Sequence, residues 1–202
     1  MEPFTREQGV AAPLLSANID TDVIMPKQFL KGIDRAGLDR GVFHDLRFLP
    51  EGGPNPEFVL NRAPWRDARF LVVGPNFGCG SSREHAVWGL RQLGIRALIG
   101  SSFAGIFFDN CQRNGVLLIE LDQERVGEIG EWVSEAGSAT LEIDLPAQTI
   151  TLANGVVVAF DIDGLRKDAL ISGLDAIDRT LTMSDRIERF EARHFADQPW
   201  LA

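Results

Sequence analysis

Residues 69–90, RFLVVGPNFGCGSSREHAVWGL, set the fold class that we expect for this chain. The apolar run 69–73 is typical of a strand that is buried on both faces, and a glycine-rich loop follows it. Residues 82–93 are a predicted helix, because apolar side chains recur on one face: Ala86, Val87, Leu90 and Leu93. Gly94 suits the C-terminal cap of that helix. The stretch therefore predicts a strand, a loop and a helix in direct succession.

The pattern continues downstream of this stretch. The apolar runs 96–100 and 115–121 are predicted strands, and the segment 102–114 between them is a predicted helical turn. Helical connections between apolar strands imply a parallel sheet with right-handed crossovers.

The later part of the chain contains short β-rich runs at 139–145, 148–153 and 156–162. Asn154–Gly155 joins the last two runs and is a strong hairpin signal. Helices are expected near 163–172 and 184–193, with Ser184 as the N-cap of the second. The chain therefore mixes a parallel α/β unit with antiparallel strands. We expect a single domain over residues 1–202, with the helix at 184–193 packed on it.

The composition argues against several function classes. A net charge of −9 disfavours a nucleic acid or an anionic membrane surface as the main partner. No apolar run approaches the roughly 18–20 residues that span a bilayer, and the first residues lack the pattern of a signal peptide. The two cysteines, Cys79 and Cys111, do not make a disulfide framework. These features favour a reducing cytoplasm.

The glycine-rich loop contains side chains suited to binding an anion. Ser81 followed by Glu84 fits a capping box, which would place Ser81 at the mouth of the helix, with Ser82 and Arg83 in its first turn. Free backbone N–H groups would hold an anion there, and the arginine adds a planar fork suited to a carboxylate. The same pattern also occurs at ordinary helix starts with a solvated arginine, and the loop alone does not separate the two.

Other well-known loop chemistries fail on residue identity. A dinucleotide-binding loop needs a third glycine where Arg83 stands, and a P-loop needs a lysine that is missing here. A nucleophile elbow needs a serine where Gly80 stands, and Cys79 lacks the second cysteine of a dithiol motif. What remains is a carboxylate site with a serine hydroxyl beside it.

The string GCGSSREHA is similar to the swivel-domain signature of the aconitase superfamily, and most similar to the small subunits of bacterial-type 3-isopropylmalate dehydratase. Further matching stretches follow in the expected order: NIDTDVIMPKQFL at 18–30, FVLN at 58–61, SFAGIFFDNCQRNGVL at 102–117 and SGLDAIDRTL at 172–181. This resemblance implies the swivelling three-layer β/β/α domain. Val87 and Gly105 depart from the pattern, since many relatives have proline and aspartate there.

The resemblance also implies a reaction. Enzymes of this family isomerise a hydroxy acid by dehydration and rehydration, here 2-isopropylmalate and 3-isopropylmalate in leucine biosynthesis. A [4Fe–4S] cluster held by three cysteine thiolates acts on the departing hydroxyl. Because this chain has only two cysteines, we expect no cofactor on it and expect the cluster on a large partner subunit.

Individual residues acquire roles from the same resemblance. Ser81 matches the base that removes a proton beside a carboxylate, and Asp22 matches an active-site aspartate that orients the serine loop. Arg83 matches the arginine that binds a substrate carboxylate, with Ser82 and Gly80 beside it. Structural roles are expected for Glu84 as a cap, for His85 in a satisfied hydrogen bond and for Asp20 in an Asx turn. No residue is expected to bind a metal.

The segment 28–38 corresponds to the family's loop that recognises the variable side chain of the substrate, with Leu30, Lys31 and Arg35 as candidates. The sequence leaves open whether Lys31 or Arg35 holds a third carboxylate or whether the site is apolar. It also leaves open whether Cys79 is a thiol whose modification blocks substrate or a small residue that fills the loop.

Two other functions compete with this one. A related hydro-lyase subunit would act on homoaconitate, citraconate or dimethylmalate. A carboxylate-binding or interaction module would use the same loop without chemistry. Substrate profiling separates the first rival, and the need for a cluster-bearing partner separates the second.

Overall fold

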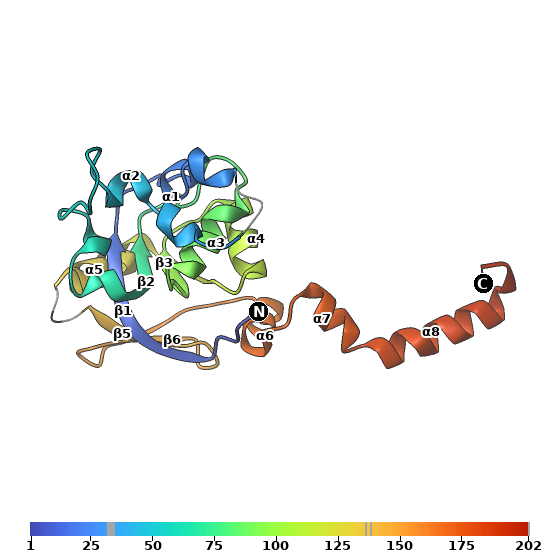
Figure 1. The fold of residues 1–202 in the computed structure, drawn as a ribbon. Coiled ribbons are helices and arrows are strands. Elements are labelled where there is room, and N and C mark those ends of the chain that lie inside the picture. Colours follow the sequence, from blue (N-terminus) through green and yellow to red (C-terminus); the bar gives the residue numbers. More distant parts are fainter. Residues whose placement is uncertain (32–34, 136, 138, 202) are drawn as a thin grey trace.

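The computed structural model describes residues 1–31, 35–135, 137 and 139–201, and its centre is one curled sheet (Figure 1). The strand order is β4-β3-β2-β1-β5-β6-β7, with β1 to β4 parallel and β5 to β7 joined antiparallel. The strands are β1 (Arg6–Leu14), β2 (Ala68–Val73), β3 (Ala97–Gly100), β4 (Leu117–Glu120), β5 (Thr140–Asp144), β6 (Thr149–Leu152) and β7 (Val157–Ala159). The expected α/β class, a parallel sheet plus antiparallel strands with flanking helices, is confirmed.

The helices connect and cover these strands. The α-helices are α1 (Thr21–Ile24), α2 (His44–Arg47), α3 (Glu84–Gln92), α4 (Gly105–Arg113), α5 (Gln123–Ser134), α6 (Gly164–Ser172), α7 (Ala176–Leu181) and α8 (Ser184–Asp197). Short 3₁₀ turns are η1 (Lys27–Leu30), η2 (Leu38–Gly41), η3 (Val59–Asn61), η4 (Trp65–Asp67) and η5 (Pro199–Leu201). Among the described residues, no helix has the length and apolar character that crossing a membrane requires.

The parallel strands are buried on both faces, which explains their uninterrupted apolar sequences. On one face, β2 and β3 direct Leu71, Val73 and Leu98 into a core shared with α3, α4 and the turns between β1 and β2. On the other face, Phe70 and Ile99 pack in a second core with α5 and the antiparallel strands. The parallel strands therefore lie between a layer of helices on one face and, on the other, α5 together with the curled antiparallel half of the sheet.

Strand β1 joins the two halves, and the sequence analysis did not predict it. It pairs in parallel with β2 over Val10–Leu14 and antiparallel with β5 over Arg6–Val10. Pro13 would normally argue against a central strand, because proline lacks an N–H for the ladder. Here Pro13 lies beyond the part that pairs with β5, so its missing donor does not interrupt that ladder.

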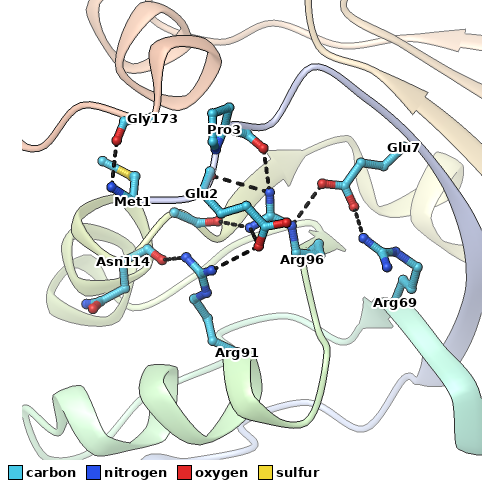
Figure 2. Close-up of polar contacts among 10 residues, drawn as sticks. Met1, Glu2, Pro3, Glu7, Arg69, Arg91, Arg96, Asn114 and Gly173 are labelled. Carbon is cyan, nitrogen blue, oxygen red and sulfur yellow. Dashed lines mark hydrogen bonds and ion pairs between the residues drawn. The ribbon is translucent and has the colours of Figure 1, made fainter.

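A buried arginine fixes the start of β1 against the parallel strands (Figure 2). Arg96, which is 4% exposed, donates from Nε to Glu7 at 2.8 Å and from Nη2 to the Pro3 carbonyl at 2.8 Å. The second carboxylate oxygen of Glu7 accepts a 2.5 Å hydrogen bond from Arg69. A buried charge is tolerated only when it is paired in this way.

The C-terminal elements α7 and α8 extend away from the body of the molecule (Figure 1). None of the side chains in α8 is buried. The expectation that this helix packs on the domain is therefore wrong for the isolated chain, because its apolar residues meet no core surface. Ser184 is also not the N-cap: Met183 occupies that position, and the Ser184 hydroxyl donates to the Leu181 carbonyl.

The hairpin prediction is confirmed. Gly155 has φ +86° and its N–H donates to the Leu152 carbonyl, while Asn154 accepts from the N–H of Val156. Gly94 likewise takes φ +102° directly after α3, as expected for its capping role.

Candidate functional site

Two segments that are far apart in sequence meet beyond the carboxyl ends of β1 and β2. The Gly78 N–H donates to the Ile19 carbonyl, and the Thr21 N–H donates to the Cys79 carbonyl, both at 2.8 Å. The loop after β3 joins them, since Phe77 donates to the Ser102 carbonyl. Ligands of α/β sheets characteristically bind at this edge.

Glycines allow the loop between β2 and α3 to take this path. Gly78 has φ +77°, and a Cβ atom there would lie 2.2 Å from Cγ of Phe107. Gly80 has φ +90° and only ordinary contact distances around it, so its need for glycine is conformational. The loop thus brings Ser81 and Ser82 to the surface, where both side chains are exposed.

An ion pair connects the two segments. Nη1 of Arg83 lies 2.5 Å from Oδ1 of Asp22 and 3.3 Å from the Met25 carbonyl oxygen. The arginine side chain is 11% exposed and the aspartate 43%. Among the described residues, both hydrogen bonds of the Arg83 side chain come from Nη1, so Nε and Nη2 are the candidates for contacting a ligand. Asp22 therefore contacts the serine loop through the arginine.

The predicted capping box at Ser81 and Glu84 is wrong. Helix α3 starts at Glu84, and Arg83 is its N-cap in an extended conformation with no side-chain cap bond. The Glu84 carboxylate instead accepts from Nδ2 of Asn114 at 2.9 Å, and Asn114 accepts from the Trp88 indole at 3.0 Å. Glu84 thus has the expected structural role, but it ties α3 to the end of α4 instead of capping its own helix.

The remaining predicted residues have structural contacts. Asp20 accepts from the N–H of Val23 at 2.8 Å and caps α1, so the segment after it is a helical turn and not a strand. The His85 ring stacks at a tilt on Trp88, 4.7 Å between centroids. Nothing in these contacts requires chemistry of either residue.

The predicted recognition loop contains the candidates Leu30, Lys31 and Arg35. Residues 32–34 of this loop lie outside the described residues. Leu30 is half-buried against the first core, and Lys31 is exposed. The Arg35 guanidinium stacks on the Trp88 ring at 3.9 Å, and Gln92 donates to its carbonyl oxygen. Arg35 is therefore held on α3.

Two positions that the sequence analysis left unassigned help to build the site. Thr21 is buried and contacts the serine loop twice, and Asn114 links Glu84 to Trp88. The position of Thr21 between Asp20 and Asp22 could have pointed to its role in the site. Nothing in the sequence around Asn114 indicated that it would link Glu84 to Trp88.

The donor set does not fit an iron–sulfur cluster. Cys79 is partly exposed in the loop, whereas Cys111 is fully buried in α4. Burial raises the pKa of the Cys111 thiol well above its usual range, which disfavours the thiolate that a metal requires. In the part of the chain that the structure describes, no group of three or more His, Cys, Asp or Glu side chains is arranged to hold a metal ion.

A mixed sheet of this topology with a glycine-rich loop at its carboxyl edge is the architecture of an aconitase-type swivel domain, and the sequence model of the aconitase C-terminal domain matches residues 1–124. A model named LeuD_N matches residues 131–164, and the C-terminal domain of the 3-isopropylmalate dehydratase small subunit matches residues 177–202. The chain belongs to the family of 3-isopropylmalate dehydratase small subunits.

Individual relatives agree with this membership. The 3-isopropylmalate dehydratase small subunit 1 of Mannheimia succiniciproducens is 60% identical, covering 100% of this chain and 99% of the relative. Small subunit 2 of Salmonella typhimurium is 54% identical, covering 100% and 96%. The crystal structure of 3-isopropylmalate dehydratase from Methanocaldococcus jannaschii superposes with a TM-score of 0.67 at 26% identity, covering 90% of this chain and 99% of that chain.

Proposed function

We propose that this chain is the small subunit of a two-chain hydro-lyase that interconverts 2-isopropylmalate and 3-isopropylmalate in leucine biosynthesis. Relatives that are named for this subunit and match the full length of the chain support the proposal. The single structural observation that carries it is the Asp22–Arg83 pair with the exposed Ser81 beside it, on an open surface. An open site of this kind suits a partner that supplies the other side.

In this proposal the chain positions the substrate and moves a proton. The free N–H groups of Arg83 bind a substrate carboxylate, and Asp22 holds the guanidinium in place. Ser81, as its alkoxide, takes the proton from the carbon beside that carboxylate, and the hydroxyl leaves the neighbouring carbon as hydroxide, which the Lewis acid of the partner subunit would accept. The proton and hydroxide then add back to the double bond with their carbons exchanged. Ser82 and Gly80 line the same surface. The loop with Leu30, Lys31 and Arg35 recognises the isopropyl side chain.

The partner in this proposal is a large subunit that carries the [4Fe–4S] cluster. The two cysteines of this chain, Cys79 and Cys111, are too few to supply the three thiolates that hold such a cluster. The net charge of −9 disfavours a nucleic acid or an anionic membrane surface as partner. It still permits a small dicarboxylate substrate, because one arginine can set the local field, and the proposal places the enzyme in the cytoplasm.

The test is anaerobic reconstitution with the cognate large subunit and a panel of substrates: isopropylmalate, homoaconitate, citraconate and dimethylmalate. Ser81→Ala is expected to lower isopropylmalate turnover by about 10²–10⁴-fold, the usual contribution of a general base, while the subunits still associate. Ser16→Ala, an exposed serine outside the site, serves as the control. Near-normal kcat in Ser81→Ala would exclude Ser81 as the base, and faster turnover of another substrate would reassign the reaction.

A further inference from the structure

Thr21 lies at the centre of the contact between the two segments. Its side chain is 2% exposed, and its hydroxyl donates to the Ser81 carbonyl oxygen at 2.8 Å. Its backbone N–H donates to the Cys79 carbonyl oxygen at 2.8 Å. One residue therefore holds the carbonyl groups of the two residues that flank Gly80.

This arrangement matters because few other contacts fix the backbone conformation of the serine loop at Gly80 and Ser81. Gly80 has φ +90° and lacks a side chain, so its backbone is free to rotate. The Ser81 side chain has no hydrogen-bond partner among the described residues, and it stands before α3 begins. The orientation of its Cα–Cβ bond thus depends on how the backbone is held.

Thr21 is itself well anchored. It is the first residue of α1, its carbonyl accepts from the N–H of Met25 at 2.9 Å, and Asp20 caps the same helix. The Asp22–Arg83 pair is a separate contact two residues further along the serine loop. The chain can therefore lose the Thr21 hydroxyl bond without losing the ion pair.

We propose that Thr21 is a positioning residue, whose hydroxyl fixes the Ser81 carbonyl and so aims the Ser81 side chain at the substrate. The inference rests on the proposed role of Ser81. A displacement of a reacting group by about 1 Å can cost 10²-fold in rate, so a single hydroxyl at this place has a large effect on turnover.

Near-isosteric variants in the reconstituted enzyme test the proposal. Thr21→Val removes the hydroxyl and keeps the shape, and it is expected to lower kcat by about 10- to 100-fold. KM should change little, because Asp22 and the Met25 carbonyl still hold Arg83. Thr21→Ser restores the hydroxyl and is expected to restore kcat. Wild-type kcat in Thr21→Val, or an equal loss in Thr21→Ser, would overturn the proposal.

The control removes a similar bond elsewhere. The Ser134 hydroxyl donates to the Gly130 carbonyl at 2.7 Å within α5, and Ser134→Ala should leave kcat and KM unchanged. Should the valine variant fail to fold, Thr21→Ala carries the same comparison, since it removes the hydroxyl without placing a methyl group against the carbonyl. Wild-type kcat in the folded alanine variant would equally overturn the proposal.

A second readout needs no turnover. Iodoacetamide should label Cys79 in the isolated chain, because Cys111 is fully buried. Labelling is expected to be faster in Thr21→Val and Thr21→Ala than in wild type and Thr21→Ser, since the Cys79–Ser81 backbone is released. Equal rates in all four proteins would contradict the inference. If the reconstituted wild-type subunits show no isopropylmalate turnover while the Cys79 labelling rates of the variants still differ as expected, that result counts against the proposed function and not against the role of Thr21 in holding the loop.

Discussion

Arg83 and Asp22 are 61 residues apart in sequence, yet their side chains meet at 2.5 Å. One N–H group of the guanidinium serves the aspartate, which leaves the planar fork partly available for a carboxylate. The pair orients the arginine and also offsets part of its charge, so the guanidinium is not a bare cation on the surface.

Arg83→Lys is expected to raise the KM for isopropylmalate by about tenfold, equivalent to roughly 1.4 kcal/mol of binding. Lysine keeps the charge but cannot supply two parallel N–H donors. Steady-state kinetics of the reconstituted enzyme measure the change. Arg125→Lys, in the exposed pair with Glu128 on α5, is the matched control. An unchanged KM for Arg83→Lys would refute the carboxylate-binding role.

At this scale the sequence singled out residues that the structure places on adjoining segments, but it did not predict the contacts between them. Ser81, Arg83 and Asp22 do lie on neighbouring segments, and their chemical roles remain predictions. The Ser81 and Glu84 pattern suggested a capping box, but tertiary contacts override it. Thr21 and Asp22 hold the loop in an extended path through Arg83, so the helix begins later. Such contacts between distant segments are not encoded in a local pattern.

Among the elements, the loop between β2 and α3 is the most constrained. Gly78→Ala is expected to destabilise the protein by about 2–4 kcal/mol, combining the cost of a left-handed backbone with overpacking against Phe107. Urea unfolding measures the loss. Gly127→Ala in α5 has open space around its Cβ position and should instead stabilise by about 0.5–1 kcal/mol. Similar effects of both substitutions would contradict this account of the loop.

For helix α8 we expect the opposite, namely that its removal has little effect on stability. Because none of its side chains is buried, deletion of residues 184–202 should change the free energy of unfolding of the body by less than about 0.5 kcal/mol. Thermal unfolding followed by circular dichroism compares the two proteins. A clear loss of stability would mean that the helix packs on the domain in solution, as the sequence analysis expected.

Most strands and crossover helices of the parallel half were predictable, because fully buried strands are uniformly apolar. Strand β1 was not, since Gly9 and Pro13 are unfavourable in strands and its two different partners supply the ladder. Helix α5 was also missed, although Asp122 caps it and Val126, Ile129 and Val133 mark its buried face. Strand β1 could not be predicted because it depends on tertiary pairing, whereas the pattern of α5 was present in the sequence.

At the scale of the whole molecule, the segments that follow β1 and β2 meet at the carboxyl edge of the sheet. Two cores pack on either face of the parallel strands, and beyond them the buried Thr21 holds the exposed serine loop while Asp22 pairs with Arg83. In the proposed reaction this chain contributes the serine and the arginine, and the partner subunit contributes the cluster.

The most direct test of this account is the rate of 2-isopropylmalate isomerisation by each subunit alone and by the two together, measured anaerobically. We predict turnover only when this chain and the large subunit are both present, rising with the amount of this chain until the two are equimolar. Turnover by this chain alone, or by the large subunit at the full rate without it, would contradict the account.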